Sequence, residues 1–227
     1  AFRYELDPTP EQRILLAKHA GARRFVWNWA LAARIQWWEA NKDDPARPKR
    51  PNAQSQNKEI VRLKKTELPW LSEVSKCAPQ SALRDLDLAF VRFFRRANRG
   101  NAPGFPRFKK KGVCRDSFRL EGRCIRSESD AIRLPYFGCI HTKESTHKLS
   151  GRVLNATVSR EADRWFVSLC VESERPTPTQ TQGPAVGVDL GLTTFATMVS
   201  SDGTTEKISA PKPLKTKLEL LARRQRQ

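Results

Sequence analysis

The sequence predicts an α+β protein of several domains, and three observations support this fold class. Apolar residues recur at helical spacing through most of the first 100 residues, and the spacing becomes that of short strands after residue 103. The stretch before residue 185 is rich in Pro, Thr and Gln, as linkers are. A new apolar strand pattern then begins. With 227 residues, the chain can bury one large core or two modest ones.

The N-terminal segment predicts a short strand followed directly by a helix. Residues 2–6 alternate in the manner of a strand. Thr9 is a suitable N-cap, Pro10 fits the first helical position, and Gln12 completes a capping box. We therefore expect a helix to begin near residue 10.

This helical pattern continues to about residue 40 and is rich in tryptophan. Gly21 interrupts it, so the sequence favours two helices close together. Phe25, Trp29 and Ala32 fall on one helical face, which favours core packing over base stacking. Asn28 lies between two tryptophans in the middle of a helix, where its amide needs a polar partner.

Two more helices are expected after the polar, proline-containing stretch 41–55, which predicts an exposed loop. The first covers residues 56–68 and ends before Pro69. The second begins at Pro79 and has one apolar face, formed by Leu83, Leu86, Phe90, Phe93, Phe94 and Ala97. Its other face carries several arginines.

Five later segments read as strands because they are short, rich in β-branched and aromatic residues, and separated by turn residues. They are DSFRLE, AIRLP, CIHTK, RVLNATVSRE and RWFVSLCVE. In the last segment, Trp165, Val167, Leu169 and Val171 line one face. So many short strands indicate a small barrel or sandwich.

The charge of the chain favours a polyanionic partner, and nucleic acid is the usual one. The chain has 42 Lys and Arg against 24 Asp and Glu, a formal net charge of +18. No apolar stretch reaches the roughly 20 residues of a membrane helix, so we expect a cytoplasmic protein without a membrane partner. The five cysteines form no C-x-x-C pair, and the three histidines are scattered, so zinc is not expected.

The basic residues are densest between residues 105 and 126. They are Arg107, Lys109, Lys110, Lys111, Arg115, Arg119, Arg123 and Arg126. Cations that follow phosphates are typical of nucleic-acid grooves, and we favour that role over a solvated strand rim. The interleaved Phe105, Phe108 and Phe118 are expected to pack into the core rather than to stack on bases.

Asp189 stands inside the apolar run Val186–Leu192, which reads as a buried strand, where a carboxylate needs a cation or hydrogen bonds. It could bind Mg²⁺ for phosphodiester cleavage, belong to the phosphate-binding hairpin of an actin-like ATPase or sugar kinase, or accept bonds from turn amides. An ATPase of that type would open with this hairpin, whereas about 184 residues of basic sequence precede it here. We therefore favour the magnesium interpretation.

Several longer motifs occur together in one order. They are RYELDPTPEQRILLAKHAGARRFVWNWAL, the pattern from Trp70 to Gln80, GFPRFKKK, IRLP, LNATVSREADRWFVSLCVE and GVDLGLTTFATMVSSDG. In this order they resemble TnpB, the transposon-encoded RNA-guided DNA endonucleases, and the compact type V CRISPR effectors related to them. The resemblance covers essentially the whole chain.

The resemblance implies a wedge-type β-barrel interrupted by a helical recognition domain and followed by the start of a RuvC-like nuclease domain of the RNase H fold. On this scheme, residues 1–8 form the first barrel strand, 9–102 the recognition domain and 103–174 the rest of the barrel. Residues 175–184 form a linker, and 185–227 begin the nuclease domain.

The resemblance also implies two partners, a guide RNA and a target double-stranded DNA with a short motif beside the target. The residues expected to read this motif are Lys76, Gln80, Asn52 and Gln56. Cys77 stands where an aromatic residue can occur in the family, so the preferred motif stays open. Arg3 joins the basic residues as an expected nucleic-acid contact.

Asp189 matches the first catalytic carboxylate of this family, a Mg²⁺ ligand. The later Glu, the second Asp and the zinc ribbon have no match, and Asp202 and Glu206 do not replace them. A single carboxylate holds Mg²⁺ poorly, so we expect this chain alone not to cut DNA. A homodimer or a partner supplying the rest of the nuclease domain is expected. The alternative function is a non-catalytic RNA- or DNA-binding regulator, and a simple transposase ranks third.

Overall fold

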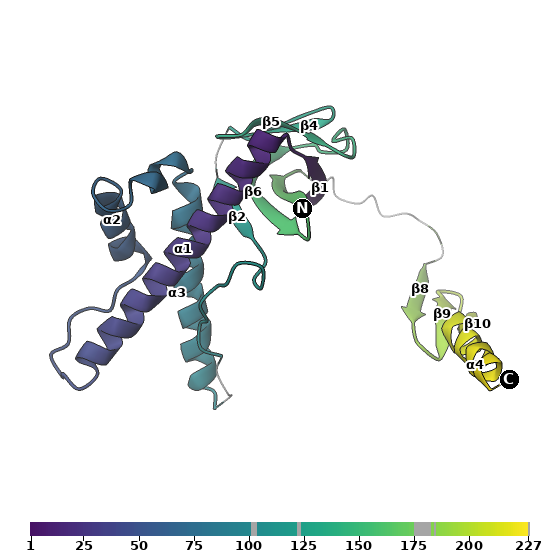
Figure 1. Ribbon diagram of the computed structural model, residues 1–227. Helices are drawn as coiled ribbons and strands as arrows, with labels where there is room; N and C mark the ends of the chain where they lie inside the picture. Colours follow the sequence, from purple (N-terminus) through teal and green to yellow (C-terminus); the bar gives the residue numbers. More distant parts are fainter. Residues whose placement is uncertain (101–103, 122–123, 175–182, 184, 227) are drawn as a thin grey trace. The chain divides into compact units, whose positions relative to one another are not determined.

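The computed structural model describes residues 1–100, 104–121, 124–174, 183 and 185–226. It divides into two compact units, Ala1–Glu174 and Arg175–Gln227 (Figure 1). The linker predicted at 175–184 lies almost wholly outside the described residues. Within the described ranges, no helix has the length and apolar character needed to cross a membrane.

The helices of the first unit follow the first strand, β1 (Phe2–Asp7), in the chain. They are α1 (Pro10–Asn41), α2 (Ala53–Leu63), the short 3₁₀ helix η1 (Pro69–Glu73) and α3 (Cys77–Ala97). The predicted capping box of α1 is confirmed, because the Thr9 hydroxyl accepts from the N–H of Gln12 while the Gln12 side chain accepts from the N–H of Thr9. The sequence therefore sets the start of α1 locally.

The helix α1 is continuous, so the prediction of two helices with a break at Gly21 is wrong. Glycine in a helix interior costs about 1 kcal/mol relative to alanine. On one side of Gly21, Leu16 and Ala20 pack into the core of the sheet, and on the other, Ala22 and Val26 pack into the core between the helices. Because α1 joins both cores, burial on either side outweighs the cost of the glycine.

The buried stripe of α1 differs from the predicted one. Phe25 is 36% exposed, and Trp29 and Ala32 are only half-buried. Val26 and Ala30 are fully buried instead. The core-facing stripe therefore lies about one position further along the helix than the sequence pattern predicts.

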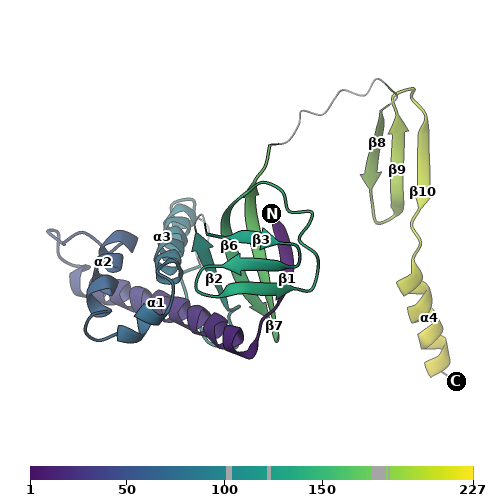
Figure 2. The same cartoon turned by 90° about the horizontal axis from the view of Figure 1, so that it is seen from above.

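The strands of the first unit form one antiparallel sheet in the order β2-β6-β7-β1-β5-β4-β3. They are β1 (Phe2–Asp7), β2 (Ser117–Glu121), β3 (Arg126–Glu128), β4 (Ala131–Leu134), β5 (Gly138–Thr142), β6 (Arg152–Glu161) and β7 (Arg164–Glu172). The sheet is strongly curled (Figure 2). Its edge strands β2 and β3 do not pair with each other in the described part of the chain. The fold is thus mixed α/β with antiparallel strands, and the sheet is not closed.

Strand alternation gives the sheet two different faces. The inner face buries residues such as Phe118, Val167 and Leu169 in one core that also contains Leu16 and Ala20 of α1. The outer face is polar, and the register places four of its residues in one row across β2, β6, β7 and β1: Arg119, Thr157, Ser168 and Arg3. The predicted inward face of β7 is confirmed.

The second unit contains a three-stranded antiparallel sheet and a helix. The elements are β8 (Val186–Leu190), β9 (Thr194–Ser200), β10 (Thr205–Ser209) and α4 (Pro213–Gln225), with β9 in the middle of the sheet. Every residue of β8 is exposed, so the prediction of a buried strand is wrong for this structure. The strand lies at the edge of a small sheet, and nothing described in this unit covers its valines.

Candidate nucleic-acid interface

The first part of the predicted cation cluster, Arg107 to Arg115, lies between α3 and β2 in a segment without regular structure, and α1 holds it in place. Arg119 lies on β2 and Arg126 on β3. Trp27 Nε1 donates a hydrogen bond to the carbonyl oxygen of Arg107 at 2.9 Å. The Asn28 side chain donates to the carbonyl oxygen of Lys109 at 2.9 Å and accepts from its N–H at 2.7 Å. The predicted need of Asn28 for a polar partner is confirmed. We call residues 107–111 the basic loop.

Within the basic loop, Lys109 differs from its neighbours. Its Nζ lies 4.0 Å from the centre of the Trp27 ring. Burial, assisted by the nearby Arg23, lowers the pKa of Lys109 to about 8. Lys110 and Lys111 are exposed.

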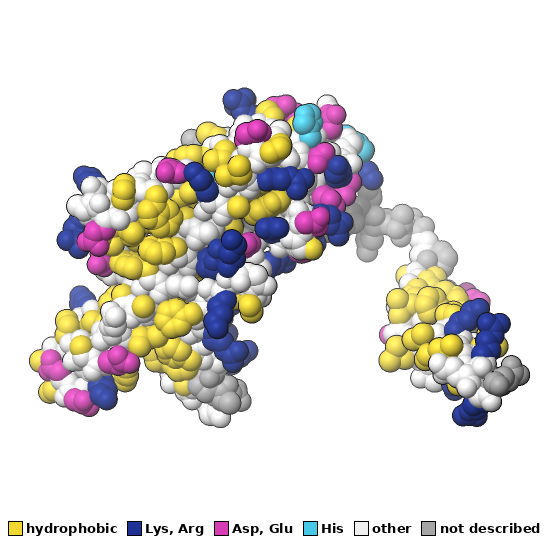
Figure 3. All heavy atoms as spheres, in the orientation of Figure 1, with side chains coloured by type: hydrophobic (Ala, Val, Ile, Leu, Met, Phe, Trp, Pro, Cys, Tyr) yellow, Lys and Arg dark blue, Asp and Glu magenta, His cyan; other side chains and the backbone are white. Residues whose placement is uncertain are grey.

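The exposed cations of the basic loop have no carboxylate partner among the ion pairs of the described residues. These cations are Arg107, Lys110 and Lys111. Lys and Arg side chains form a row that extends from the sheet along one side of α3 (Figure 3). Unpaired cations on a docked loop suit phosphate contacts, which release counterions on binding.

Two arginines of α1 join the helices to the sheet where this segment enters β2. Arg23 donates to the carbonyl oxygen of Ser117 at 3.3 Å and forms an ion pair with Asp85 of α3 at 2.5 Å. Arg24 forms an ion pair with Asp116. Both guanidinium groups are half-buried and paired, so they support the interface structurally.

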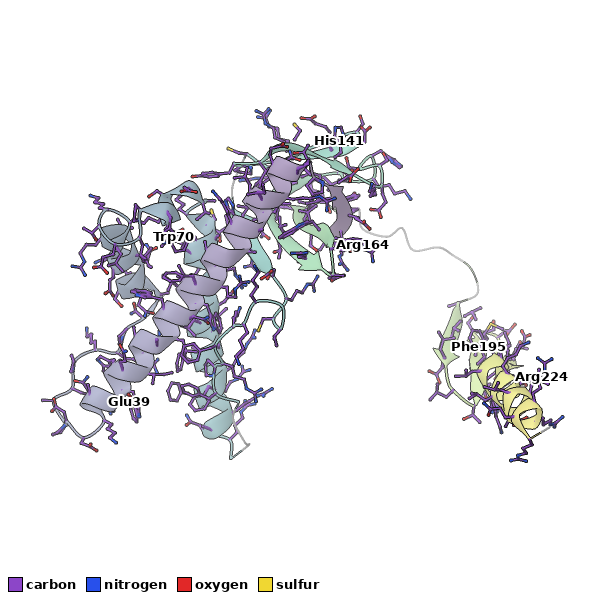
Figure 4. All side chains as sticks on the ribbon, viewed as in Figure 1. Glu39, Trp70, His141, Arg164, Phe195 and Arg224 are labelled. Carbon is purple, nitrogen blue, oxygen red and sulfur yellow. The ribbon has the colours of Figure 1, made fainter. Side chains whose placement is uncertain are left out.

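The outer face of the sheet forms a second basic surface. The guanidinium carbon of Arg3 lies 4.2 Å from the centre of the Phe166 ring, and that of Arg164 lies 5.6 Å from it. Arg119 is exposed in the same row as Arg3. Figure 4 shows Arg164 at this sheet. An aromatic ring among arginines and hydroxyls is an arrangement that binds single-stranded nucleic acids. The sequence alternation placed Phe166 opposite the core face, but did not identify it as a site residue.

A carboxylate pairs with two of the predicted basic residues and so reduces their availability for phosphate contacts. Glu161 accepts from Arg3 at 2.7 Å and also pairs with Arg115. These arginines, chiefly through the hydrogen bond from Arg3, hold the pKa of Glu161 below its usual value. Arg115 also donates to Ser159 Oγ at 2.9 Å. Arg123 lies outside the described residues.

The predicted burial of the aromatic residues is confirmed for only one of the three. Phe118 on β2 is buried. Phe105 and Phe108 are 45% and 49% exposed, so the prediction that they pack into the core is wrong. Both precede β2 in the irregular segment, where no strand alternation turns their rings inward.

The residues predicted to read a DNA motif do not form one group. Gln56 is buried, and its amide accepts from Arg34 Nε at 2.9 Å and donates to the carbonyl oxygen of Ala30 at 3.0 Å. This contradicts the expectation that Gln56 contacts DNA. Asn52 is exposed, but its side chain caps α2.

A polar groove lies beside one of the predicted motif readers. Gln80 borders a groove of about 300 Å³ together with Gln54, Asn57 and Arg84. Lys76 is exposed at the start of α3. Gln54 and Asn57 were not predicted as site residues, although two amides at i, i+3 on a helix lie on one face.

Asp189 lies on β8, opposite Thr197 of β9, which in turn pairs with Lys207 of β10. In the described part of the chain, no three His, Cys, Asp or Glu side chains lie close enough to hold a metal ion. Mg²⁺ needs near-octahedral oxygen ligands. The described residues therefore do not by themselves fit a magnesium site.

The chain matches two family models. HTH_OrfB_IS605, a helix-turn-helix domain, matches residues 1–43, and OrfB_IS605, a probable transposase, matches residues 168–227. In the structure the first range holds β1 and the continuous α1 rather than two helices.

Curated relatives match most of the chain. The "Putative RNA-guided DNA endonuclease InsQ" of Escherichia coli is 35% identical over 205 residues, covering 90% of this chain and 48% of the relative. A "Putative RNA-guided DNA endonuclease" of Mycobacterium tuberculosis is 34% identical, covering 98% and 53%. One of Streptomyces pristinaespiralis is 33% identical, covering 100% and 53%. The chain spans about half the length of these relatives.

The structure also aligns with a CRISPR-Cas12f ternary complex over 96% of this chain and 52% of that chain. The sequence identity is 12% and the TM-score 0.37. The family membership of the chain follows from the sequence matches at both of its ends and from the relatives that match nearly all of it. By these matches, the chain belongs to the TnpB (OrfB) family.

Proposed function

We propose that this chain is the guide-RNA- and target-DNA-binding part of an RNA-guided DNA endonuclease. The observation that carries the proposal is the identity of 33–35% with relatives bearing that printed name, across 90–100% of this chain. The geometry supports it in two places. The basic loop offers unpaired cations on a docked backbone, and the outer sheet face offers Phe166 among arginines.

The proposed division of labour follows the chain order. The curled sheet corresponds to a wedge-type barrel, and the helices between β1 and β2 to a recognition domain inserted into it. The basic loop and the outer sheet face contact the guide RNA. Lys76 and the groove at Gln80 contact the duplex beside the target. The complex would act in the cytoplasm and at the nucleoid.

The unit Arg175–Gln227 is proposed as the start of a RuvC-like domain, with Asp189 as one ligand of Mg²⁺. Support comes from the position of Asp189 on a strand within the range that the OrfB_IS605 model matches. Bound Mg²⁺ would supply activation of water for phosphodiester cleavage. The other carboxylates would come from sequence outside these 227 residues or from a partner, including a second copy.

The cleavage part of the proposal has a direct test. With Mg²⁺, guide RNA and a matching target, this chain alone should not nick DNA, and Asp189→Asn should behave identically. Nicking that is lost in Asp189→Asn would show that the described residues suffice for catalysis, and would overturn the incomplete-site proposal.

Guide binding is tested by RNA co-purification. The chain is expressed with the DNA that flanks its gene, washed at high salt, and the retained RNA is sequenced. We expect one discrete RNA, with a lower yield for Lys110→Gln/Lys111→Gln and an unchanged yield for the matched control Lys215→Gln/Lys217→Gln on α4. Heterogeneous RNA lost as salt rises would indicate a non-specific polycation and favour the regulator.

A further inference from the structure

The C-terminal halves of α1 and α3, with the loop that follows α1, enclose an apolar groove of about 940 Å³. Its aromatic lining consists of Trp37, Trp38, Phe90, Phe93, Phe94 and Phe105. Figure 3 shows hydrophobic side chains gathered between these two helices. We call this feature the aromatic groove. Its lining shares no residue with the basic loop or with the groove at Gln80.

The rings of the aromatic groove are ordered against one another but remain accessible. Phe93 packs edge-on against Phe94 and Phe105, with ring centres 5.1 and 5.3 Å apart. Trp38 is 53% exposed and Phe94 42% exposed. A contiguous exposed patch of large aromatic residues marks a binding surface.

Two cations stand at the rim of the aromatic groove. The guanidinium carbon of Arg50 lies 5.0 Å from the centre of the Phe94 ring, and that of Arg47 lies 5.7 Å from the Trp38 ring. Both arginines are exposed, and neither takes part in an ion pair within the described ranges. Arg34, by contrast, is buried and paired with Asp87. The rim therefore has two exposed cations that are available to an anionic ligand.

We propose that the aromatic groove binds an unpaired nucleobase of a single-stranded RNA or DNA segment, an inference that rests on the proposed nucleic-acid-binding function. The base would stack on an exposed ring, and the adjoining phosphate would contact Arg47 or Arg50. A purely apolar protein segment would match the rings but leave the two arginines at the rim without an anionic partner.

The test uses the whole chain and short single-stranded RNA and DNA that carry one fluorescent purine base. Fluorescence titration gives the affinity, and a fully paired duplex of the same sequence is measured in parallel. Trp38→Leu should weaken single-strand binding roughly tenfold, the scale of one lost stacking contact. Arg50→Gln removes a cation from the rim, so it should weaken binding severalfold. Duplex affinity should stay unchanged in both variants.

Two matched controls separate the groove from general effects. Trp70→Leu removes a tryptophan that is 39% exposed elsewhere among the helices (Figure 4), and Arg62→Gln removes an exposed charge on α2 for comparison with Arg50→Gln. Equal losses in groove and control variants would overturn the proposal. So would unchanged oligonucleotide affinity combined with loss of a dimer in Trp38→Leu by light scattering, since the groove would then bind a second copy.

The outcomes also distinguish this inference from the proposed function. If the wild type retains no discrete RNA but binds single strands through Trp38, the guide-binding proposal fails and the groove stands. If a discrete RNA is retained and Trp38→Leu changes neither its yield nor single-strand affinity, the groove proposal alone fails.

Discussion

Asn28 and Lys109, separated by 81 positions in the sequence, exchange two hydrogen bonds between one side-chain amide and one backbone residue. The amide satisfies both the carbonyl oxygen and the N–H of Lys109, as a neighbouring strand would. The basic loop has no strand or helix of its own at this point. Its cations are therefore positioned by α1, and the tryptophan-rich helix supports the proposed nucleic-acid surface.

Asn28→Leu should release the basic loop. Two half-buried hydrogen bonds would be lost, so we expect the free energy of unfolding to fall by about 2 kcal/mol in urea titrations. Affinity for RNA should fall as well, because the cations lose their fixed spacing. Asn98→Ala, an exposed change at the end of α3, is the control. Unchanged stability and RNA affinity in Asn28→Leu would show that the loop is held by other contacts.

Lys109 should make nucleic-acid affinity pH-dependent in an unusual range. The pKa of its ammonium is lowered to about 8, chiefly by burial, whereas exposed lysines titrate near 10.4. Phosphate binding favours the protonated form, so affinity should fall above about pH 8, by at most roughly tenfold per pH unit. Lys109→Arg should remove this fall, while Lys110→Arg should retain it. An identical pH profile in both variants would exclude Lys109 as its source.

Local chemistry explains what the sequence could predict. The capping box at Thr9 and Gln12 involves residues three positions apart, so the local sequence is sufficient to predict it. The alternation of Trp165, Val167 and Leu169 likewise reports the buried face of one strand directly. The demand of Asn28 for a partner was visible, although its partner, 81 residues away, was not.

The features that the sequence did not predict depend on packing between residues far apart in the chain. Gly21 does not break α1, because two cores bury the helix on either side of it. Gln56 carries the side-chain amide of a DNA-reading residue, yet this amide is hydrogen-bonded to Arg34 and to the backbone carbonyl of Ala30. The aromatic groove gathers rings from α1, α3 and the segment after α3, so no single stretch contains its pattern.

His19 should make stability sensitive to mild acid. Its Nδ1 lies 2.8 Å from the carbonyl oxygen of Leu15, and Nε2 accepts from the N–H of Ser75 at 3.0 Å, which fits the neutral ring. Burial lowers the pKa of His19 in the folded state. Below about pH 6.5 the unfolded chain therefore binds a proton that the folded chain does not. The free energy of unfolding consequently decreases as the pH is lowered.

This prediction is checked by urea denaturation at neutral pH and near pH 5.5. The unfolding free energy of the wild type should be lower at the acid pH. His19→Gln should be less stable at neutral pH but lose this part of the pH dependence, and the exposed His147→Gln should keep it. The same pH dependence in wild type and His19→Gln would rule out His19 as its origin.

Glu161→Gln should strengthen nucleic-acid binding, because Glu161 pairs with both Arg3 and Arg115 on the outer sheet face. Freed guanidinium groups can contact phosphates, so the slope of log affinity against log salt should steepen by up to about 0.9 for each new contact. Glu172→Gln makes the same change of charge at an exposed position of β7. If both variants steepen the slope equally, the effect is one of net charge. A steeper slope in Glu161→Gln alone would identify the sheet face as a phosphate-binding surface that the carboxylate restrains.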